Sequence, residues 1–217
     1  MKNHRTRSIT ALILAGGQSS RMGEDKALVK WQNQPLLQII CDVALKTCPA
    51  VYILTPWPDR YRSIVPSDCH FLLESQAHRG PLVALTEGIS QLPPCDWVWL
   101  LACDLPRLDR KIIQNWLNLL GDIPDSTLAV VPYHDNYFEP LCGFYRGAIA
   151  PSLQRFQQAG GRSFQKFLGQ VPTHKLILNE PEILTLWNCN TPADVSPNGA
   201  RAGIKPTPES DGITKDK

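Results

Sequence analysis

Short apolar runs alternate along this chain with longer segments whose apolar residues repeat at helical spacing. Thr10–Leu14 and Val51–Leu54 are short runs rich in aliphatic residues, as expected of β-strands. Trp97–Ala102 is almost wholly apolar, which is typical of a central strand covered by helices on both faces. The alternation predicts an α/β fold, with a mostly parallel, twisted sheet flanked by helices.

The helical segments are marked by apolar positions that recur every three to four residues. Pro35 opens such a segment, and its apolar face runs from Leu36 to Thr47. A second helix is predicted from Gly80 and Pro81 to Gln91. The remaining predicted elements are a turn or hairpin at Trp31–Gln34, strands at His70–Leu73, Leu128–Val131, Leu141–Tyr145 and Lys175–Leu178, and helices at Asp109–Leu120, Ala148–Gln158 and Ser163–Leu168.

Length and composition indicate one folded domain. The chain has 217 residues, of which 43% are apolar and 19% charged, so it can bury a full core and is no highly charged disordered protein. We predict that the domain spans residues 8–195, after a short N-terminal extension at residues 1–7. Residues 196–217 are rich in proline, glycine, serine and charged residues, and we expect them to form a disordered tail.

The charge pattern argues against nucleic acid and membrane partners. Lys and Arg number 22 against 20 Asp and Glu, and no basic cluster exceeds the short stretch from Lys2 to Arg7. The longest apolar run, Trp97–Cys103, is too short to cross a bilayer, and the polar N-terminus has no apolar signal core. The seven cysteines show no metal-ligand spacing, which favours small buried side chains in a reducing compartment. We therefore expect a soluble cytoplasmic protein.

The loop after the first strand carries the densest set of candidate functional residues. Ligands of open α/β sheets bind beyond the carboxyl ends of the strands, which is where this loop begins. Gly16 and Gly17 allow the backbone to turn and to present N–H groups to an anion, and Arg21 and Lys26 add two cations. This set predicts a cradle for a polyphosphate. The spacing matches neither a P-loop nor Gly-x-Gly-x-x-Gly, and an ordinary glycine turn with solvated charges is the alternative.

Asp104 is the candidate metal ligand. It follows the most apolar strand and should lie at the same sheet edge as the glycine loop. Mg²⁺ is usually bound through one or two carboxylates together with phosphate oxygens of the substrate, which suits a single aspartate at this place. The alternative is that Asp104 closes the strand into a turn, although Asp109 could cap the helix that follows.

Two weaker candidates lie elsewhere in the chain. Glu74 ends the third predicted strand and could lie beside a nucleotide, or it could be a solvated carboxylate. Asn188 and Asn190 could place two amides near a second substrate, but the same segment could simply start a helix with Thr191 as its N-cap. The chain has no Gly-x-Ser-x-Gly and no histidine triad pattern, so hydrolysis by a serine or cysteine nucleophile is not expected.

The segment from Leu14 to Leu28 resembles the signature of the molybdenum cofactor guanylyltransferases, which are nucleotidyltransferases with a Rossmann-like α/β fold. The pair Gly16 and Gly17 and the pair Asp25 and Lys26 favour the guanylyl family over its cytidylyl relatives. The resemblance spans about residues 8 to 195 and continues at Gly80–Leu82, Cys103–Pro106, Glu139–Arg146 and Asn188–Asp194.

The resemblance implies roles for the matching residues. Lys26 takes the phosphates, and Asp104 takes Mg²⁺ together with the nucleotide. Leu14, Ala15 and Gly16 take the guanine and sugar side. Together with the roles assigned above from residue chemistry, the complete candidate sets are Leu14, Ala15, Gly16, Gly17, Lys26, Glu74 and Asp104 for the nucleotide, Arg21, Lys26 and Asp104 for catalysis, with Arg21 and Lys26 stabilising the leaving group, and Asn188 and Asn190 for the second substrate.

The implied reaction transfers GMP from GTP to the terminal phosphate of molybdenum-molybdopterin, forming the guanine dinucleotide cofactor and pyrophosphate. An acceptor phosphate oxygen attacks the α-phosphorus in line, so the protein must mainly position the substrates and neutralise charge on the leaving group. Transient contact with cofactor-biosynthesis or acceptor proteins is a further expectation. Two alternatives stay open: a cytidylyltransferase acting on the same pterin or on a sugar or polyol phosphate, and a nucleotide-binding module without catalysis.

Overall fold

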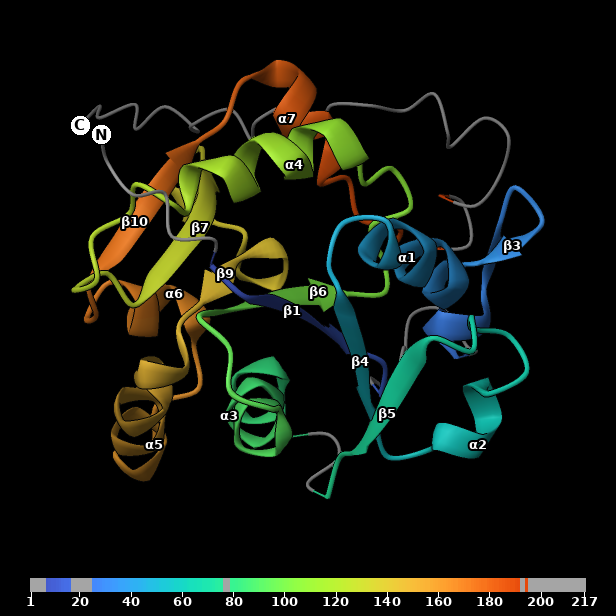
Figure 1. Cartoon of the computed structure of the whole chain (residues 1–217), viewed down its shortest axis with the longest axis horizontal. Helices are drawn as coiled ribbons and strands as arrows, with labels where there is room; N and C mark the ends of the chain where they lie inside the picture. Colours follow the sequence, from blue (N-terminus) through green and yellow to red (C-terminus); the bar gives the residue numbers. More distant parts are fainter. Residues whose placement is uncertain (1–6, 17–24, 76–78, 192–193, 195–217) are drawn as a thin grey trace, which may run out of the picture.

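The computed structural model describes residues 7–16, 25–75, 79–191 and 194, and a central β-sheet runs through it (Figure 1). Its strands are β1 Ile9–Leu14, β4 Ala50–Thr55, β5 Cys69–Leu73, β6 Trp97–Ala102, β7 Ala129–His134, β8 Tyr137–Phe138, β9 Phe144–Tyr145 and β10 Thr173–Ile177. They lie in the order β10-β7-β9-β6-β1-β4-β5, with β8 paired to β7. Only the pairs that involve β8 or β9 are antiparallel among these strands. The mostly parallel sheet predicted from the sequence is confirmed.

Helices cover both faces of this sheet. The α-helices are α1 Leu36–Leu45, α2 Pro58–Tyr61, α3 Pro81–Gln91, α4 Arg110–Leu119, α5 Ala150–Gln158, α6 Phe164–Leu168 and α7 Glu180–Thr185, and short 3-10 helices lie at η1 Lys26–Leu28, η2 Pro140–Cys142 and η3 Gly147–Ile149. In Figure 1, α1 and α4 lie on one side of the sheet and α3 and α5 on the other. A small hairpin of β2 Lys30–Trp31 and β3 Gln34–Pro35 turns at Gln32 and Asn33, which both have positive φ, as in a type I′ turn.

The central strand β6 separates two apolar cores. Trp97, Trp99 and Leu101 point into the core that contains α1 and α4. Val98 and Leu100 point into the core that contains α3 and α5. Successive side chains of a strand face opposite sides of the sheet, so a strand buried on both faces must be apolar throughout. All six residues of β6 are buried, which confirms the interpretation of this run as a central strand.

Most predicted elements are present within one to three residues of their predicted ends, but one strand prediction is wrong. Residues Leu141–Tyr145 were expected to form a strand, whereas Pro140–Cys142 form the 3-10 helix η2 and only Phe144–Tyr145 pair in the sheet. Pro140 supplies no backbone N–H for a ladder, which favours the helical turn over strand pairing. The sequence analysis also missed α2 and α7, which are only 4 and 6 residues long.

The parallel strands bring distant loops to one edge of the sheet. β1 pairs with β4 and β6, and β4 pairs with β5, all in parallel, so their carboxyl ends point the same way. Gly16, Glu74 and Asp104 directly follow three of these ends. The edge therefore brings together Gly16, Glu74 and Asp104, three of the residues singled out in the sequence.

The two predicted end segments are mostly outside the described residues. Of the N-terminal extension, Arg7 is described and donates a hydrogen bond of 2.9 Å from its Nη1 to Asp125 Oδ1. The predicted tail at residues 196–217 lies entirely outside the described residues. Within the described part of the chain, the helices are too short or too polar to pass through a membrane.

Candidate nucleotide site

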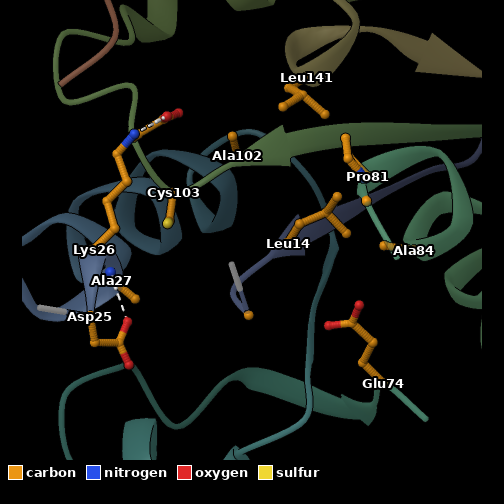
Figure 2. A pocket seen from close by; sticks show the side chains of 13 residues that line it. Leu14, Asp25, Lys26, Ala27, Glu74, Pro81, Ala84, Ala102, Cys103 and Leu141 are labelled. Atoms are coloured by element: carbon orange, nitrogen blue, oxygen red, sulfur yellow. Dashed lines mark hydrogen bonds and ion pairs between the residues drawn. The ribbon is translucent and has the colours of Figure 1, made fainter. Parts of the chain in front are cut away.

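A cavity of about 460 Å³ opens at the carboxyl edge of the sheet (Figure 2). Its walls come from the ends of β1, β5 and β6, from the segment around η1 and from the start of α3. The lining residues are Leu14, Gly16, Asp25, Lys26, Ala27, Glu74, Gly80, Pro81, Ala84, Ala102, Cys103, Asp104 and Leu141. Gly16, Lys26 and the aspartate after β6 thus face one cavity. Figure 2 shows Lys26 and Glu74 on opposite sides of it, with Leu14 between them.

Lys26 joins three distant parts of the chain. Its Nζ donates a hydrogen bond to Asp104 Oδ2 at 2.5 Å and another to Asn190 Oδ1 at 2.7 Å. The side chains of Lys26 and Asp104 are only 17% and 15% exposed. Solvent therefore screens this ion pair less than it would a pair on the surface, and the pair links the segment of Lys26 to the loop of Asp104.

One carboxylate oxygen of Asp104, a residue of the cavity wall, has no hydrogen-bond partner within the described part of the chain. This oxygen, Oδ1, is buried. An unpaired buried oxygen is costly, so such an atom in a folded protein calls for an explanation such as an ion. The cap of α4 is Asp109, whose Oδ1 accepts hydrogen bonds from the backbone of Lys111 at 2.7 Å and Ile112 at 3.1 Å. Asp104 is therefore not needed as a helix cap.

Asp25 fixes the segment that carries Lys26. Its Oδ1 accepts a hydrogen bond of 3.1 Å from the backbone N–H of Ala27 and caps η1. Its Oδ2 accepts hydrogen bonds from Tyr61 Oη at 2.7 Å and from Arg60 Nη1 at 3.0 Å. Burial and the neighbouring carboxylate of Asp25 raise the pKa of Tyr61, so its phenol stays a donor. Sequence reasoning missed this support because it did not predict α2.

Gly16 makes a close approach that no other residue could make without rearrangement. A Cβ atom at this position would lie 2.6 Å from Glu74 Oε2 and 2.7 Å from Pro56 Cδ. The Glu74 carboxylate therefore lies close to Gly16, and both residues line the cavity. Ala15 is buried, and its N–H donates to Leu54 O at 3.0 Å, so it supports the turn from within the core.

The start of α3 forms the remaining wall. Gly80 has φ +90° and ψ 163°, a conformation that residues with a Cβ rarely adopt. Pro81 occupies the first turn of this 11-residue helix, where its missing N–H is not needed. The helix therefore begins sharply at the cavity wall, on the side of Ala84 and away from Lys26.

The other titratable groups near the cavity do not form a second reactive centre. Burial raises the pKa of the Cys103 thiol to about 12, so it is protonated at neutral pH and is a poor nucleophile. Burial also raises the pKa of Glu139, and its hydrogen-bond partner His134 opposes this shift. Within the described ranges, His, Cys, Asp and Glu side chains do not gather in threes at metal-binding distance. A cation in the cavity would therefore need oxygens of its ligand in addition to a carboxylate of the lining.

The remaining predicted site residues differ in how the structure places them. Asn190 contacts Lys26, whereas Asn188 donates its Nδ2 hydrogen bond to Leu186 O at 3.3 Å and does not line the cavity. Gly17 and Arg21 lie outside the described residues. The link between Lys26 and Asn190 had no signal in the sequence, since the two are 164 positions apart.

A parallel α/β sheet with a glycine turn, a lysine and an aspartate around one cavity at its carboxyl edge defines a nucleotide-binding protein of the nucleotidyltransferase class. Comparison with known proteins is consistent with this class. The chain belongs to the MobA-like NTP transferase domain family, whose model matches residues 11–174.

Curated relatives carry more specific names. A probable molybdenum cofactor guanylyltransferase of Trichormus variabilis is 47% identical over 189 residues, which cover 87% of this chain and 89% of that protein. A protein of the same name from Synechococcus elongatus is 41% identical, with 86% and 96% covered.

Solved structures support the fold. Molybdopterin-guanine dinucleotide biosynthesis protein A from Archaeoglobus fulgidus superposes with a TM-score of 0.71 at 18% identity, covering 86% of this chain and 94% of that one. 4-Diphosphocytidyl-2C-methyl-D-erythritol synthase from Anaerococcus prevotii gives a TM-score of 0.65 at 12% identity, covering 87% and 93%. The fold is thus shared with a protein named for a cytidyl compound, so the fold alone does not determine which nucleotide base is bound.

Proposed function

We propose that this protein transfers GMP from GTP to the terminal phosphate of molybdenum-molybdopterin and releases pyrophosphate. The observation that carries this proposal is the contact between the Lys26 ammonium and the Asp104 carboxylate in the cavity that Leu14 and Gly16 also line. The names of relatives at 41–47% identity support GTP as the nucleotide and the molybdenum cofactor as the acceptor.

The cavity offers distinct surroundings for the two ends of GTP. Leu14 and Ala84 are apolar and suit the face of a base, and Glu74 on the same side can accept hydrogen bonds from guanine N–H groups or ribose hydroxyls. Lys26, on the opposite side, suits the phosphates, and Arg21 is the second cation assigned to them. We therefore place the nucleoside toward Glu74 and the triphosphate toward Lys26.

Asp104 is the residue that would hold Mg²⁺. Its buried Oδ1 lacks a partner within the described part of the chain, and a hard cation prefers carboxylate and phosphate oxygens. One protein carboxylate is a common number for Mg²⁺ when the substrate supplies phosphate oxygens. When bound, the ion would offset negative charge on the triphosphate as pyrophosphate leaves.

The chemistry requires little from the protein beyond placement and charge. An oxygen of the acceptor phosphate forms a bond to the α-phosphorus of GTP, and the bond from that phosphorus to the bridging oxygen of pyrophosphate breaks. Lys26 donates hydrogen bonds to the phosphate chain and stabilises the charge that develops on the leaving group. Asn190, next to Lys26, and Asn188 are assigned to the acceptor side.

A pyrophosphate-release assay tests the proposal. Purified protein is incubated with GTP, CTP or ATP, each with and without molybdopterin, and the expected result is release with GTP only when molybdopterin is present. Preference for CTP would favour the cytidylyltransferase alternative. Nucleotide binding without pyrophosphate release under every condition would favour a non-catalytic module and contradict the proposal.

A further inference from the structure

The segment that follows α7 is hydrogen-bonded to the loop that follows β6. The backbone N–H of Cys189 donates to the carbonyl oxygen of Asp104 at 2.9 Å. The hydroxyl of Thr185 donates to the carbonyl oxygen of Arg107 at 3.0 Å and accepts from the backbone N–H of Asp109 at 2.5 Å. Thr185 is one of few buried polar side chains, at 3% exposure. One hydroxyl thus satisfies two backbone groups of the Asp104 loop.

A cluster of Arg107, Trp187 and Trp31 lies at the same junction. The Arg107 guanidinium lies 4.6 Å from the ring centroid of Trp187 and 5.9 Å from that of Trp31. The two tryptophan rings are 5.3 Å apart. Trp31 belongs to the hairpin that follows the Lys26 segment, so this cluster joins the three parts of the chain that meet at Lys26. A guanidinium over an aromatic face is attracted by the ring, more strongly when water is excluded.

This junction controls where Asn190 lies. Asn190 is exposed, so packing does not fix its side chain, yet its Oδ1 is 2.7 Å from Lys26 Nζ. Its backbone N–H donates to Asp194 Oδ2 at 2.9 Å, and the preceding residue, Cys189, is tied to Asp104. The position of the Asn190 amide therefore follows from how the segment docks on the Asp104 loop.

We propose that Thr185 and Arg107 are positioning residues that hold the Asp104 loop and the Asn190 segment at the spacing required by a metal-bound triphosphate. This inference rests on the proposed function, since it assumes that Asp104 holds the metal. Outer groups that orient a metal ligand commonly change metal-dependent affinity by about 10- to 100-fold when removed. Thr185 and Arg107 reach Asp104 only through the backbone, so the lower end of that range is expected.

Removal of the Thr185 hydroxyl should leave the protein folded. The N-terminal end of α7 has its own anchors, because Asn179 and Glu182 form a capping box and Glu182 Oε1 accepts a hydrogen bond of 3.0 Å from Trp116 Nε1 on α4. Thr185→Val keeps the shape of the side chain and deletes only its hydrogen bonds. Thr185→Ser keeps the hydroxyl and serves as the conservative variant.

The test compares binding of GTP with and without metal in the full-length protein. Calorimetry gives the dissociation constant of GTP in Mg²⁺ and in EDTA. Thr185→Val should weaken binding about tenfold in Mg²⁺ and less than about twofold in EDTA, and Thr185→Ser should stay close to the wild type. Thr173→Val is the matched control, because the Thr173 hydroxyl donates to Leu168 O at 3.0 Å and Val171 O at 3.1 Å at the start of β10.

A second pair of variants guards against loss of folding. Arg107→Met removes the guanidinium from the Trp187 ring. It should weaken GTP binding about threefold in Mg²⁺ and change it less in EDTA. Arg62→Met is its control, since the Arg62 guanidinium lies over Phe71, at 5.2 Å, outside the cavity lining. If Thr185→Val does not fold, the Arg107 pair alone decides.

The outcomes separate this inference from the proposed function. If the variants bind GTP equally more weakly in Mg²⁺ and in EDTA, or bind it as the wild type does in both, the positioning role is overturned. The proposed function would stand in that case, provided that the wild-type protein releases pyrophosphate. Wild-type protein that showed neither Mg²⁺-dependent GTP binding nor pyrophosphate release would overturn the proposed function and this inference with it.

Discussion

Replacing Lys26 by methionine should change metal binding and turnover in opposite directions. In the structure the Lys26 ammonium already occupies a point between two oxygens, Asp104 Oδ2 and Asn190 Oδ1. A divalent cation that approaches Asp104 without a nucleotide must therefore compete with a resident positive charge. When a triphosphate is present, its oxygens can accept the hydrogen bonds of the Lys26 ammonium, and the Asp104 carboxylate can then bind the divalent cation.

The size of this competition follows from the geometry. Because the carboxylate charge is shared by two oxygens, the charge centres lie about 3–4 Å apart, and opposite charges at that separation attract by roughly 4–6 kcal/mol at an effective dielectric constant of ~20. Much of this is offset, because the displaced ammonium regains hydration and side-chain freedom. If about a third to a half remains, Lys26→Met should raise the affinity for a divalent cation without nucleotide by about 10- to 100-fold, at ~1.4 kcal/mol per tenfold.

The effect on turnover is the reverse. A charge-assisted hydrogen bond from Lys26 to a phosphate oxygen contributes about 1.5–3 kcal/mol, so its loss should lower kcat/KM for GTP by roughly 10- to 150-fold. Mn²⁺ binding is followed by the loss of the free-ion signal in electron paramagnetic resonance, and turnover by pyrophosphate release. Lys30→Met, which alters an exposed lysine on β2, is the control. A Lys26→Met protein that binds Mn²⁺ no better than the wild type in the absence of nucleotide would refute the reasoning.

Three further predictions follow from the site and its neighbours. Asp104→Asn should lower pyrophosphate release at least ~1,000-fold and abolish Mg²⁺-dependent GTP binding, and near wild-type release from a folded variant would remove the metal assignment. Gly80→Ala should lower the free energy of unfolding, measured in urea, by about 1–2 kcal/mol, because a residue with a Cβ is strained at φ +90°. An unchanged urea midpoint of unfolding would contradict this strain. Burial raises the pKa of Glu139 above its ordinary 4.5, so its contribution to stability is full below pH 4.5 and is lost as pH rises through the raised pKa. The stability of the wild type relative to Glu139→Gln should therefore fall over that interval, and a rise in urea titrations would contradict the shift.

The elements that position the site could be predicted where the sequence pattern is strong. Trp97–Ala102 is apolar at every position, so both its burial and the placement of Asp104 beyond its end follow from the pattern. Gly80 and Pro81 mark the start of α3, because glycine tolerates the positive φ before the helix and proline lacks an N–H that the first turn does not need. These local signals do not depend on distant contacts.

The contacts that complete the site could not be predicted in this way. The α7 helix did have a local signal, the capping box of Asn179 and Glu182, which was overlooked. The contacts of Lys26 with Asn190 and of Arg107 with Trp187 join residues far apart in the chain, and no periodicity or spacing encodes which distant residues meet. They depend on how α7 docks on the Asp104 loop, which is a property of the packed fold.

The most direct test of the account is a crystal structure with Mn²⁺ and a non-hydrolysable GTP analogue. The account predicts an anomalous peak at the Asp104 carboxylate, with the phosphates against Lys26 in the cavity at the carboxyl edge of the sheet. Nucleotide bound elsewhere, for example in the groove between α3 and α5 lined by Thr86, Gln157 and Arg162, with no metal at Asp104, would contradict it.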